Sequence, residues 1–216
     1  MIRIKLTEEN LESVAKKAAE HIRQGEVVIF PTDTLYGLGV DALKTTSVEK
    51  LFALKKRPAS KPVPVFVKNI EMAKEFAFID KKKEAVLERL WPGPFTVVLD
   101  KKEDISDRLS AGTGKVGLRM PADNFCLELL RRFEGPITGS SANVSGMSSY
   151  SDIDAILRQF KEYSEEPAFV VDAGVLEEKE PSTVVDLTGA HPRILRMNQT
   201  TLKKLKEVFD NLDTRS

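Results

Sequence analysis

The stretch KKRPASKPVPVFV, Lys55–Val67, marks the point where a predicted helix gives way to a predicted strand. Pro58 prevents the preceding helical pattern from continuing, because proline removes a backbone donor and clashes with the preceding turn. The residues after it turn apolar and β-branched, which predicts a strand at 63–67. Pro62 and Pro64 cannot donate to a ladder, so we expect this strand to avoid the centre of a sheet, at least at its start.

The rest of the chain alternates between helical and strand-like patterns. Helical periodicity occurs at 8–24, from a capping-box pattern at 46–49 onward, and at 82–90, 124–133, 152–160 and 200–210. Short apolar runs occur at 26–30, 95–99, 116–119, 136–139, 168–172, 182–187 and 193–196. This order predicts an α/β fold with a mixed sheet and flanking helices. No repeat or linker divides the chain, so we expect one domain at 1–210 and a polar tail at 211–216.

Composition limits the classes of function. Lys plus Arg number 33 and Asp plus Glu also number 33, so the net charge gives no global attraction to nucleic acid or membrane. The single cysteine, Cys126, rules out an intramolecular disulfide and suits a reducing compartment. The amino terminus lacks the apolar run of a signal peptide, and no run reaches membrane-spanning length. We therefore expect a soluble, cytoplasmic protein.

Two stretches suggest polar sites near strand ends. PTDTLYGLG, 31–39, follows a predicted strand and combines hydroxyl side chains with Gly37 and Gly39, which allow close backbone approach; a plain turn is the alternative. The second is the cation cluster of the opening stretch, whose members are Lys55, Lys56, Arg57 and Lys61. Prolines fix the backbone beside it, which favours a preorganised phosphate site over a solvated helix end.

Two glycine-rich stretches follow later in the chain. SAGTGKVGLRMP, 110–121, is not a Walker A motif, because Leu109 stands at the first glycine position and Val116 follows the lysine. It leads into a strand that ends on Arg119; a buried arginine there would need an anionic partner, which suggests a carboxylate-binding role. ITGSSANVSG, 137–146, has the small polar side chains of an anion-binding loop; a flexible Ser/Gly linker is the alternative.

The chain lacks the usual catalytic apparatus. His21 and His191 lie far apart in sequence, no Cys/His cluster has zinc spacing, and Cys126 lies in an apolar helical pattern. Such a site suits a reaction in which the substrates supply the reacting groups and the protein supplies positioning and charge neutralisation.

Six motifs in order resemble the YrdC family of threonylcarbamoyl-AMP synthases, over about residues 25–196. They are PTDTLYGLG, KKRPASKP, WPGPFTVVL, VGLRMP, SSANVSG and STVVDLT. The resemblance implies a single-domain, open, twisted mixed sheet around a large basic cavity. It also implies a nucleotidyltransferase that makes L-threonylcarbamoyladenylate and pyrophosphate from L-threonine, bicarbonate or CO₂, and ATP with Mg²⁺. The product would serve tRNA threonylcarbamoyladenosine modification.

The resemblance also implies roles for individual residues. The threonine contacts would be Thr34, Phe66, Arg119, Gly139 and Ser182. The ATP contacts would be Lys56, Arg57, Lys61, Lys115, Ser141, Asn143, Ser149 and Arg196, with Lys56 and Arg57 also serving catalysis. No side chain is assigned to a metal. Three positions depart from the family pattern: Phe66 replaces a histidine, Lys115 replaces a small residue, and Met197 follows Arg196 in place of Pro-Gly.

Partners and alternatives complete the sequence-based hypothesis. Besides the small-molecule substrates, a threonylcarbamoyl-transferase and tRNA or another RNA are expected partners, and a membrane is not. Three other readings stay open: a carbamoyl-adenylate-forming YrdC-like enzyme, a non-catalytic RNA-binding module, and a YrdC-like paralogue of altered function. The zero net charge and the aromatic content of 7% give little support to an extended RNA surface.

Overall fold

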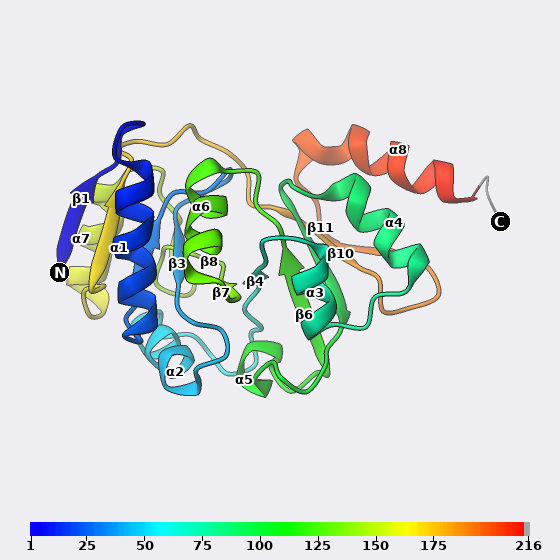
Figure 1. Cartoon of the computed structure of the whole chain (residues 1–216), viewed down its shortest axis with the longest axis horizontal. Helices are drawn as coiled ribbons and strands as arrows, with labels where there is room; N and C mark the ends of the chain where they lie inside the picture. Colours follow the sequence, from blue (N-terminus) through cyan, green and yellow to red (C-terminus); the bar gives the residue numbers. More distant parts are fainter. Residues whose placement is uncertain (214–216) are drawn as a thin grey trace.

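The computed structural model describes the backbone of residues 1–213 and the side chains of residues 1–210. Helices and strands alternate along this part of the chain (Figure 1). In chain order they are β1 (Ile2–Lys5), α1 (Leu11–Arg23), β2 (Val28–Phe30), β3 (Gly37–Gly39), α2 (Thr45–Leu54), β4 (Val65–Phe66), α3 (Ile70–Phe76), α4 (Lys81–Leu90), β5 (Phe95–Asp100), α5 (Asp107–Ser110), β6 (Lys115–Arg119), α6 (Asn124–Phe133), β7 (Ile137–Thr138), β8 (Ser140–Ser141), α7 (Ile153–Tyr163), β9 (Phe169–Asp172), β10 (Thr183–Asp186), β11 (Arg193–Arg196), the 3₁₀ helix η1 (Gln199–Thr201) and α8 (Leu202–Asp213).

The strands form two mixed sheets. One has the order β1-β9-β2-β3-β8, in which β9 is parallel to both β1 and β2. The other has the order β11-β10-β5-β6-β4-β7, with parallel pairs β10/β5 and β4/β6. The predicted mixed α/β class is confirmed, and the strands are divided between two sheets.

One short segment joins the two sheets. β7 pairs with β4 in the second sheet, and β8, which begins two residues after β7 ends, pairs with β3 in the first. Between them, the Gly139 N–H donates to the Pro64 carbonyl at 2.8 Å, and the Thr138 N–H donates to the Val40 carbonyl at 3.0 Å. The chain therefore crosses from one sheet to the other at Gly139.

Helices cover both faces of the first sheet. α1 and α6 lie side by side on one face, and α7 lies on the other (Figure 1). The strand residues alternate accordingly: Val28 and Phe30 pack toward α1 and α6, whereas Ile29 belongs to the larger core that includes α7. At the other end of the molecule, α4 and α8 pack against each other beside the second sheet.

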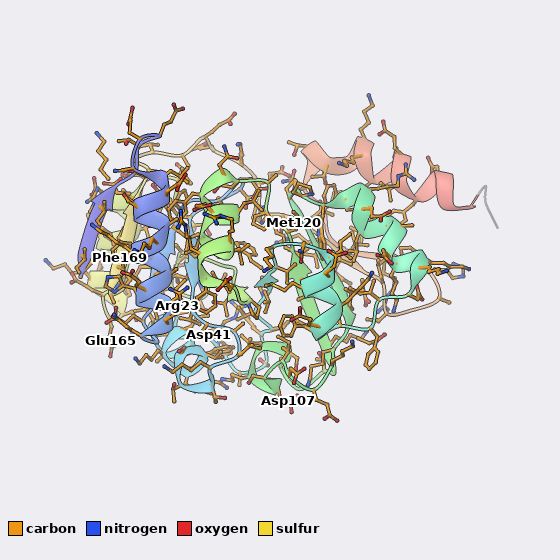
Figure 2. The ribbon with its side chains drawn as sticks, viewed as in Figure 1. Arg23, Asp41, Asp107, Met120, Glu165 and Phe169 are labelled. Carbon is orange, nitrogen blue, oxygen red and sulfur yellow. The ribbon has the colours of Figure 1, made fainter. Side chains whose placement is uncertain are left out.

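The end of α1 is tied to α6 and to β9. The Arg23 guanidinium donates to the Arg132 carbonyl and lies 5.9 Å from the ring centroid of Phe133. His21 stacks on Phe169 of β9 with ring centroids 4.5 Å apart. Figure 2 shows Arg23 and Phe169 at this end of the molecule. These contacts hold α1 against α6 and against the first sheet.

The apolar periodicity of the sequence predicted most of the longer helices and strands. Several shorter elements were not predicted. α6 and β11 have the predicted bounds, and the other predicted elements differ by a few residues. The strand pattern had not indicated β1, β3 or β8, and the helical pattern had not indicated α3 or α5. β3 (GLG) and β8 (SS) lack apolar β-branched residues, so their pairing depends on strands that are distant in sequence.

Two local expectations were wrong. The pattern at 46–49 does not cap α2: the helix begins at Thr45, and its N-cap residue, Lys44, makes no side-chain cap. The strand after Pro64 lies inside its sheet, between β6 and β7. Because β4 begins only at Val65, neither proline occupies a ladder position that needs a donor.

The end of the chain is only partly described. α8 runs to Asp213, three residues into the predicted tail at 211–216, and residues 214–216 lie outside the described part. Within residues 1–213, no helix has the length and apolar character needed to cross a membrane.

Gly39 provides a test of the packing between the sheets and α1/α6. A Cβ at this position would overlap the Phe30 ring and lie 2.8 Å from Ile137 Cγ2. We expect Gly39→Ala to lower the free energy of unfolding by about 1–3 kcal/mol, as overpacking of a core does. Urea unfolding followed by circular dichroism would measure it. Gly189→Ala is the matched control, because its Cβ would meet only the His191 carbonyl oxygen at 3.7 Å; equal stability changes in the two variants would contradict the packing argument.

Candidate functional site

A cavity of about 260 Å³ is lined by residues from both sheets. Its polar lining consists of three guanidinium groups and several hydroxyls, and no carboxylate is among the described residues that line it. The guanidinium groups belong to Arg57 after α2, Arg119 at the end of β6 and Arg196 at the end of β11. The cavity is therefore suited to an anionic ligand.

Arg119 is buried and its charge is compensated. Its Nε donates to the Gly93 carbonyl at 3.1 Å and its Nη1 to Thr34 Oγ1 at 3.1 Å, while Nη2 forms an ion pair with Asp33. The guanidinium carbon lies 5.5 Å from the Phe66 ring centroid. The second carboxylate oxygen of Asp33 is buried and has no hydrogen-bond partner. Arg119 is thus fixed from several sides, with N–H groups left for a ligand.

The PTDT loop forms a turn that orients Thr34. Thr32 Oγ1 accepts the N–H groups of Thr34 at 3.1 Å and Leu35 at 3.2 Å, and donates to the Leu35 carbonyl at 2.7 Å. Such a side-chain turn holds the backbone without a regular ladder. It directs the Thr34 hydroxyl toward Arg119.

Lys55 is the buried member of the cation cluster. Its Nζ donates to the Ser141 carbonyl at 2.5 Å, to the Asn143 carbonyl at 2.6 Å and to Asn143 Oδ1 at 3.4 Å. Burial, and to a lesser degree the charge of Arg57, lowers the pKa of Lys55 to about 7. Through these three hydrogen bonds, the amino group of Lys55 anchors the SSAN loop against the end of α2.

Sequence reasoning placed Lys55 in the cluster but gave it no role in the site. A usable signal was its helical spacing: it follows Leu51 by four residues and Phe52 by three, both buried on the core face of α2. Lys56 and Lys61, which lie beyond this helix, have exposed side chains.

The end of α2 is a Schellman-type cap centred on Lys56. The Arg57 N–H donates to the Phe52 carbonyl at 2.9 Å, the Lys56 N–H donates to the Ala53 carbonyl at 3.0 Å, and Lys56 has φ of 47°. The left-handed residue reverses the chain direction, so that Arg57 lines the cavity.

Arg57 is held by main-chain oxygens. Its Nε donates to the Lys61 carbonyl at 3.1 Å and its Nη2 to the Pro62 carbonyl at 2.7 Å. Burial lowers the pKa of Arg57, but an arginine remains protonated. No carboxylate in the described part of the chain forms an ion pair with it, so it keeps its positive charge for a ligand.

The serines of the SSAN loop line the cavity, whereas its asparagine side chain makes hydrogen bonds to neighbouring residues of the chain. Ser141 Oγ donates to Asn143 Oδ1 at 2.6 Å, and Asn143 Nδ2 donates to the Met147 carbonyl at 2.8 Å. Ser141 and Ser149 line the cavity, whereas Asn143 is not among its lining residues and accepts a hydrogen bond from Lys55. This ordered network argues against the flexible-linker interpretation.

Arg196 and Ser182 meet at the far side of the cavity. Arg196 Nε donates to the Ser182 carbonyl at 2.8 Å, and its Nη2 donates to Ser182 Oγ at 3.1 Å. Burial, followed by the charge of Arg119, lowers the pKa of Arg196. Ser182 Oγ also lies 2.9 Å from the hydroxyl of Thr96, a lining residue that sequence reasoning missed.

The cavity unites nine of the thirteen predicted site residues. These are Thr34, Arg57, Phe66, Arg119, Gly139, Ser141, Ser149, Ser182 and Arg196. The side chains that do not line it are Lys56, Lys61, Lys115 and Asn143. Lys115 Nζ instead donates to Thr188 Oγ1 at 2.6 Å and pairs with the buried Asp186 carboxylate at 3.4 Å.

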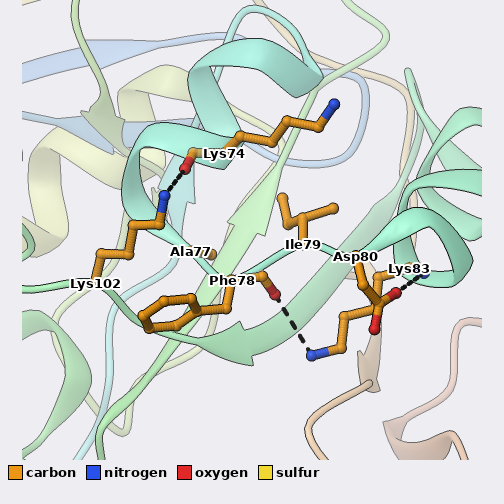
Figure 3. Close-up of a pocket in the computed structure, with 7 residues that line it drawn as sticks. All are labelled: Lys74, Ala77, Phe78, Ile79, Asp80, Lys83 and Lys102. Carbon is orange, nitrogen blue, oxygen red and sulfur yellow. Dashed lines mark hydrogen bonds between the residues drawn. The ribbon is translucent and has the colours of Figure 1, made fainter.

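A second, larger hollow of about 460 Å³ lies beside α3 and α4 (Figure 3). Lys102 Nζ donates to the Lys74 carbonyl at 2.6 Å, and Lys83 Nζ lies 3.4 Å from the Phe78 carbonyl. Two of its three cations are paired with carboxylates, Lys74 with Glu84 and Lys83 with Asp100. None of the predicted site residues lines this hollow, and its compensated charges suit an anion less well than the first cavity does.

Comparisons with known proteins identify a family that the chain resembles over most of its length. The Sua5/YciO/YrdC family model, described as "Telomere recombination", matches residues 20–198. A threonylcarbamoyl-AMP synthase of Pyrococcus abyssi is 36% identical over 199 residues, which cover 90% of this chain and 57% of the relative. The structure of Pyrococcus abyssi Sua5 complexed with L-threonine is 34% identical, with a TM-score of 0.86, and the match covers 96% of this chain and 60% of that one.

The length of these relatives differs from that of the chain. The chain spans somewhat more than half of the Pyrococcus protein. By contrast, the solution structure of the MTH1692 protein of Methanobacterium thermoautotrophicum is matched over 88% of both chains, at 39% identity and a TM-score of 0.67.

The cap at Lys56 yields a stability prediction. A left-handed conformation costs an L-residue about 1–2 kcal/mol, and glycine avoids this cost at an entropic penalty of about 0.4–1 kcal/mol. We therefore expect Lys56→Gly to raise the free energy of unfolding by about 0.5–1 kcal/mol in urea titration. Lys61→Gly is the control, since Lys61 does not have positive φ. A loss of stability in Lys56→Gly would contradict the cap assignment.

Proposed function

The chain belongs to the Sua5/YciO/YrdC family, and we propose that it is a threonylcarbamoyl-AMP synthase. It would convert L-threonine, bicarbonate or CO₂, and ATP into threonylcarbamoyl-AMP and pyrophosphate. The name of the Pyrococcus relative and the L-threonine complex of Pyrococcus Sua5 support this proposal.

The observation that carries the proposal is the convergence of Arg57, Arg119 and Arg196 on one cavity that no carboxylate among the described residues lines. The Arg119 charge is offset by Asp33, whereas the other two guanidiniums are held by neutral oxygens. Such a site attracts a triphosphate and a carboxylate together, because uncompensated guanidiniums bind both.

The proposed chemistry needs no protein nucleophile. The threonine amine adds to CO₂ and loses a proton, which gives N-carboxy-threonine. The new carboxylate oxygen attacks the α-phosphorus of ATP, the bond to the bridging oxygen breaks, and pyrophosphate leaves with the electron pair. Arg57 and Arg196 would offset the charge of the phosphates, and exclusion of water by the bound substrates would limit hydrolysis of the mixed anhydride.

The site residues divide into two proposed groups. Thr34, Phe66, Arg119, Gly139 and Ser182 would form the threonine side, and Arg57, Ser141, Ser149 and Arg196 the nucleotide side. Phe66 would offer an apolar wall, which suits the threonine methyl group. Roles for Lys56, Lys61, Lys115 and Asn143 in binding ATP stay predictions from the resemblance.

Mg²⁺ would enter with ATP as part of the substrate. Within the described residues, no group of three or more His, Cys, Asp or Glu is arranged to hold a metal ion. The phosphate oxygens and water are therefore the proposed ligands, and the metal would offset charge on the triphosphate. A transferase and tRNA that consume the adenylate, and a cytoplasmic location, likewise stay predictions.

Pyrophosphate release tests the proposed function. The assay supplies ATP, Mg²⁺, L-threonine and bicarbonate, omits each in turn, and identifies the adenylate by mass spectrometry. We expect release only in the complete mixture. Turnover only with carbamoyl phosphate would favour the carbamoyl-adenylate alternative. No turnover with either mixture would contradict the proposal and make RNA binding the next measurement.

Arg57 provides the matched substitution. We expect Arg57→Ala to lower the rate of adenylate formation by at least about 100-fold, because it removes an uncompensated cation from the cavity. The control, Arg158→Ala on α7, removes an arginine whose side chain is 72% exposed and should leave the rate unchanged. Thermal melts would show that both variants fold. A normally active Arg57→Ala protein would remove Arg57 from the proposed phosphate site.

Lys56→Gly separates the two roles considered for that residue. If the side chain serves only as part of the helix cap, the variant keeps its rate of adenylate formation while gaining stability. A fall in rate comparable to that of Arg57→Ala would instead support the predicted contact with ATP.

A further inference from the structure

Two buried hydroxyls face the cavity at the junction of β5 and β10. Thr96 Oγ1 and Ser182 Oγ lie 2.9 Å apart, and each residue is only about 5% exposed. Both line the cavity, although Thr96 belongs to none of the proposed ligand groups above. Their positions are set by the parallel pairing of β10 with β5, in which Thr96 is opposite Val184.

The side-chain rotation of Thr96 is restricted by its surroundings. A Cβ at Gly117 on the neighbouring strand β6 would lie 3.1 Å from the Thr96 methyl carbon, so that methyl fills the space above the glycine. A β-branched residue has few χ1 rotamers in a strand. With its methyl directed at Gly117, Thr96 places its hydroxyl on Ser182.

The hydrogen bonds of the pair leave one hydroxyl proton available. Ser182 Oγ already accepts from Arg196 Nη2 at 3.1 Å, and one of the two hydroxyl protons lies between Thr96 and Ser182. Among the described residues, the second proton has no acceptor. The pair can therefore donate one hydrogen bond to a ligand and accept another.

This capacity differs from that of the guanidinium groups in the same cavity. Guanidiniums only donate, and they favour anions. A neutral ligand hydroxyl, which both donates and accepts, matches the hydroxyl pair instead. A buried site built to bind a hydroxyl discriminates strongly against an analogue that lacks it, because its own polar atoms are then left unpaired.

We propose that Thr96 is a positioning residue for substrate selection: through its hydrogen bond to Ser182, it orients the hydroxyl pair to recognise the side-chain hydroxyl of the amino-acid substrate. This assignment rests on the proposed synthase function and extends it, because it names the group that separates threonine from an amino acid that lacks the side-chain hydroxyl, such as L-2-aminobutyrate.

The test compares Thr96→Val, which keeps the shape and removes the hydroxyl, with Thr96→Ser, which keeps the hydroxyl. Steady-state pyrophosphate release gives KM and kcat for L-threonine, for L-2-aminobutyrate and for ATP. We expect Thr96→Val to raise the KM for threonine about tenfold and to reduce the preference for threonine over 2-aminobutyrate by a similar factor. The KM for ATP should stay within about twofold, and Thr96→Ser should keep the wild-type preference.

The contrary outcomes are distinct. An active wild type with unchanged selectivity in Thr96→Val would overturn the role of Thr96 alone. If the KM values for threonine and ATP rose equally, Thr96 would act only through packing. The same conclusion would follow if Thr96→Ser were as impaired as Thr96→Val. A wild type without threonine-dependent release would overturn the proposed function and this assignment with it.

Discussion

The architecture depends on the absence of a side chain at Gly139. A Cβ there would overlap the Phe66 ring, so only glycine permits the chain to pass from the second sheet to the first at this point. The same ring packs edge-on against Phe30, at 6.3 Å between centroids, and faces the Arg119 guanidinium. The packing of Gly139 on the Phe66 ring thus joins the two sheets and forms part of the cavity wall. The same ring supports Arg119, a cation that lines the cavity.

The basic groups around the cavity are positioned largely by main-chain oxygens. Lys55, Arg57, Arg119 and Arg196 each donate to at least one backbone carbonyl. A carbonyl fixes the direction of a cation without cancelling its charge, whereas a carboxylate would do both. Of these four groups, Arg119 alone has a carboxylate partner within the described part of the chain, namely Asp33. Burying Arg57 and Arg196 costs free energy, and an anionic ligand in the cavity would offset that cost.

The sequence predicted those features of the structure that arise from residues close together in the chain. Apolar periodicity is local, and it located long elements such as α6 and β5. β8 consists of two serines and forms only because β3 lies beside it. The same holds for the site. Local motifs identified Arg57 and Arg119, but no motif indicated Thr96, which lies within an apolar strand pattern. Its role depends on Ser182, which is 86 residues away in the chain.

At the end of α2, adjacent residues of the cation cluster have different structural roles. Lys55 occupies the C-cap of α2 on its buried side and binds the SSAN loop, and the Ser145 N–H donates to its carbonyl at 2.8 Å. The left-handed Lys56 then turns the backbone away from the helix axis and leaves its own side chain exposed. After that reversal, Arg57 lines the cavity. Three consecutive basic residues therefore differ in burial and in hydrogen-bond partners because of the backbone geometry at the end of α2.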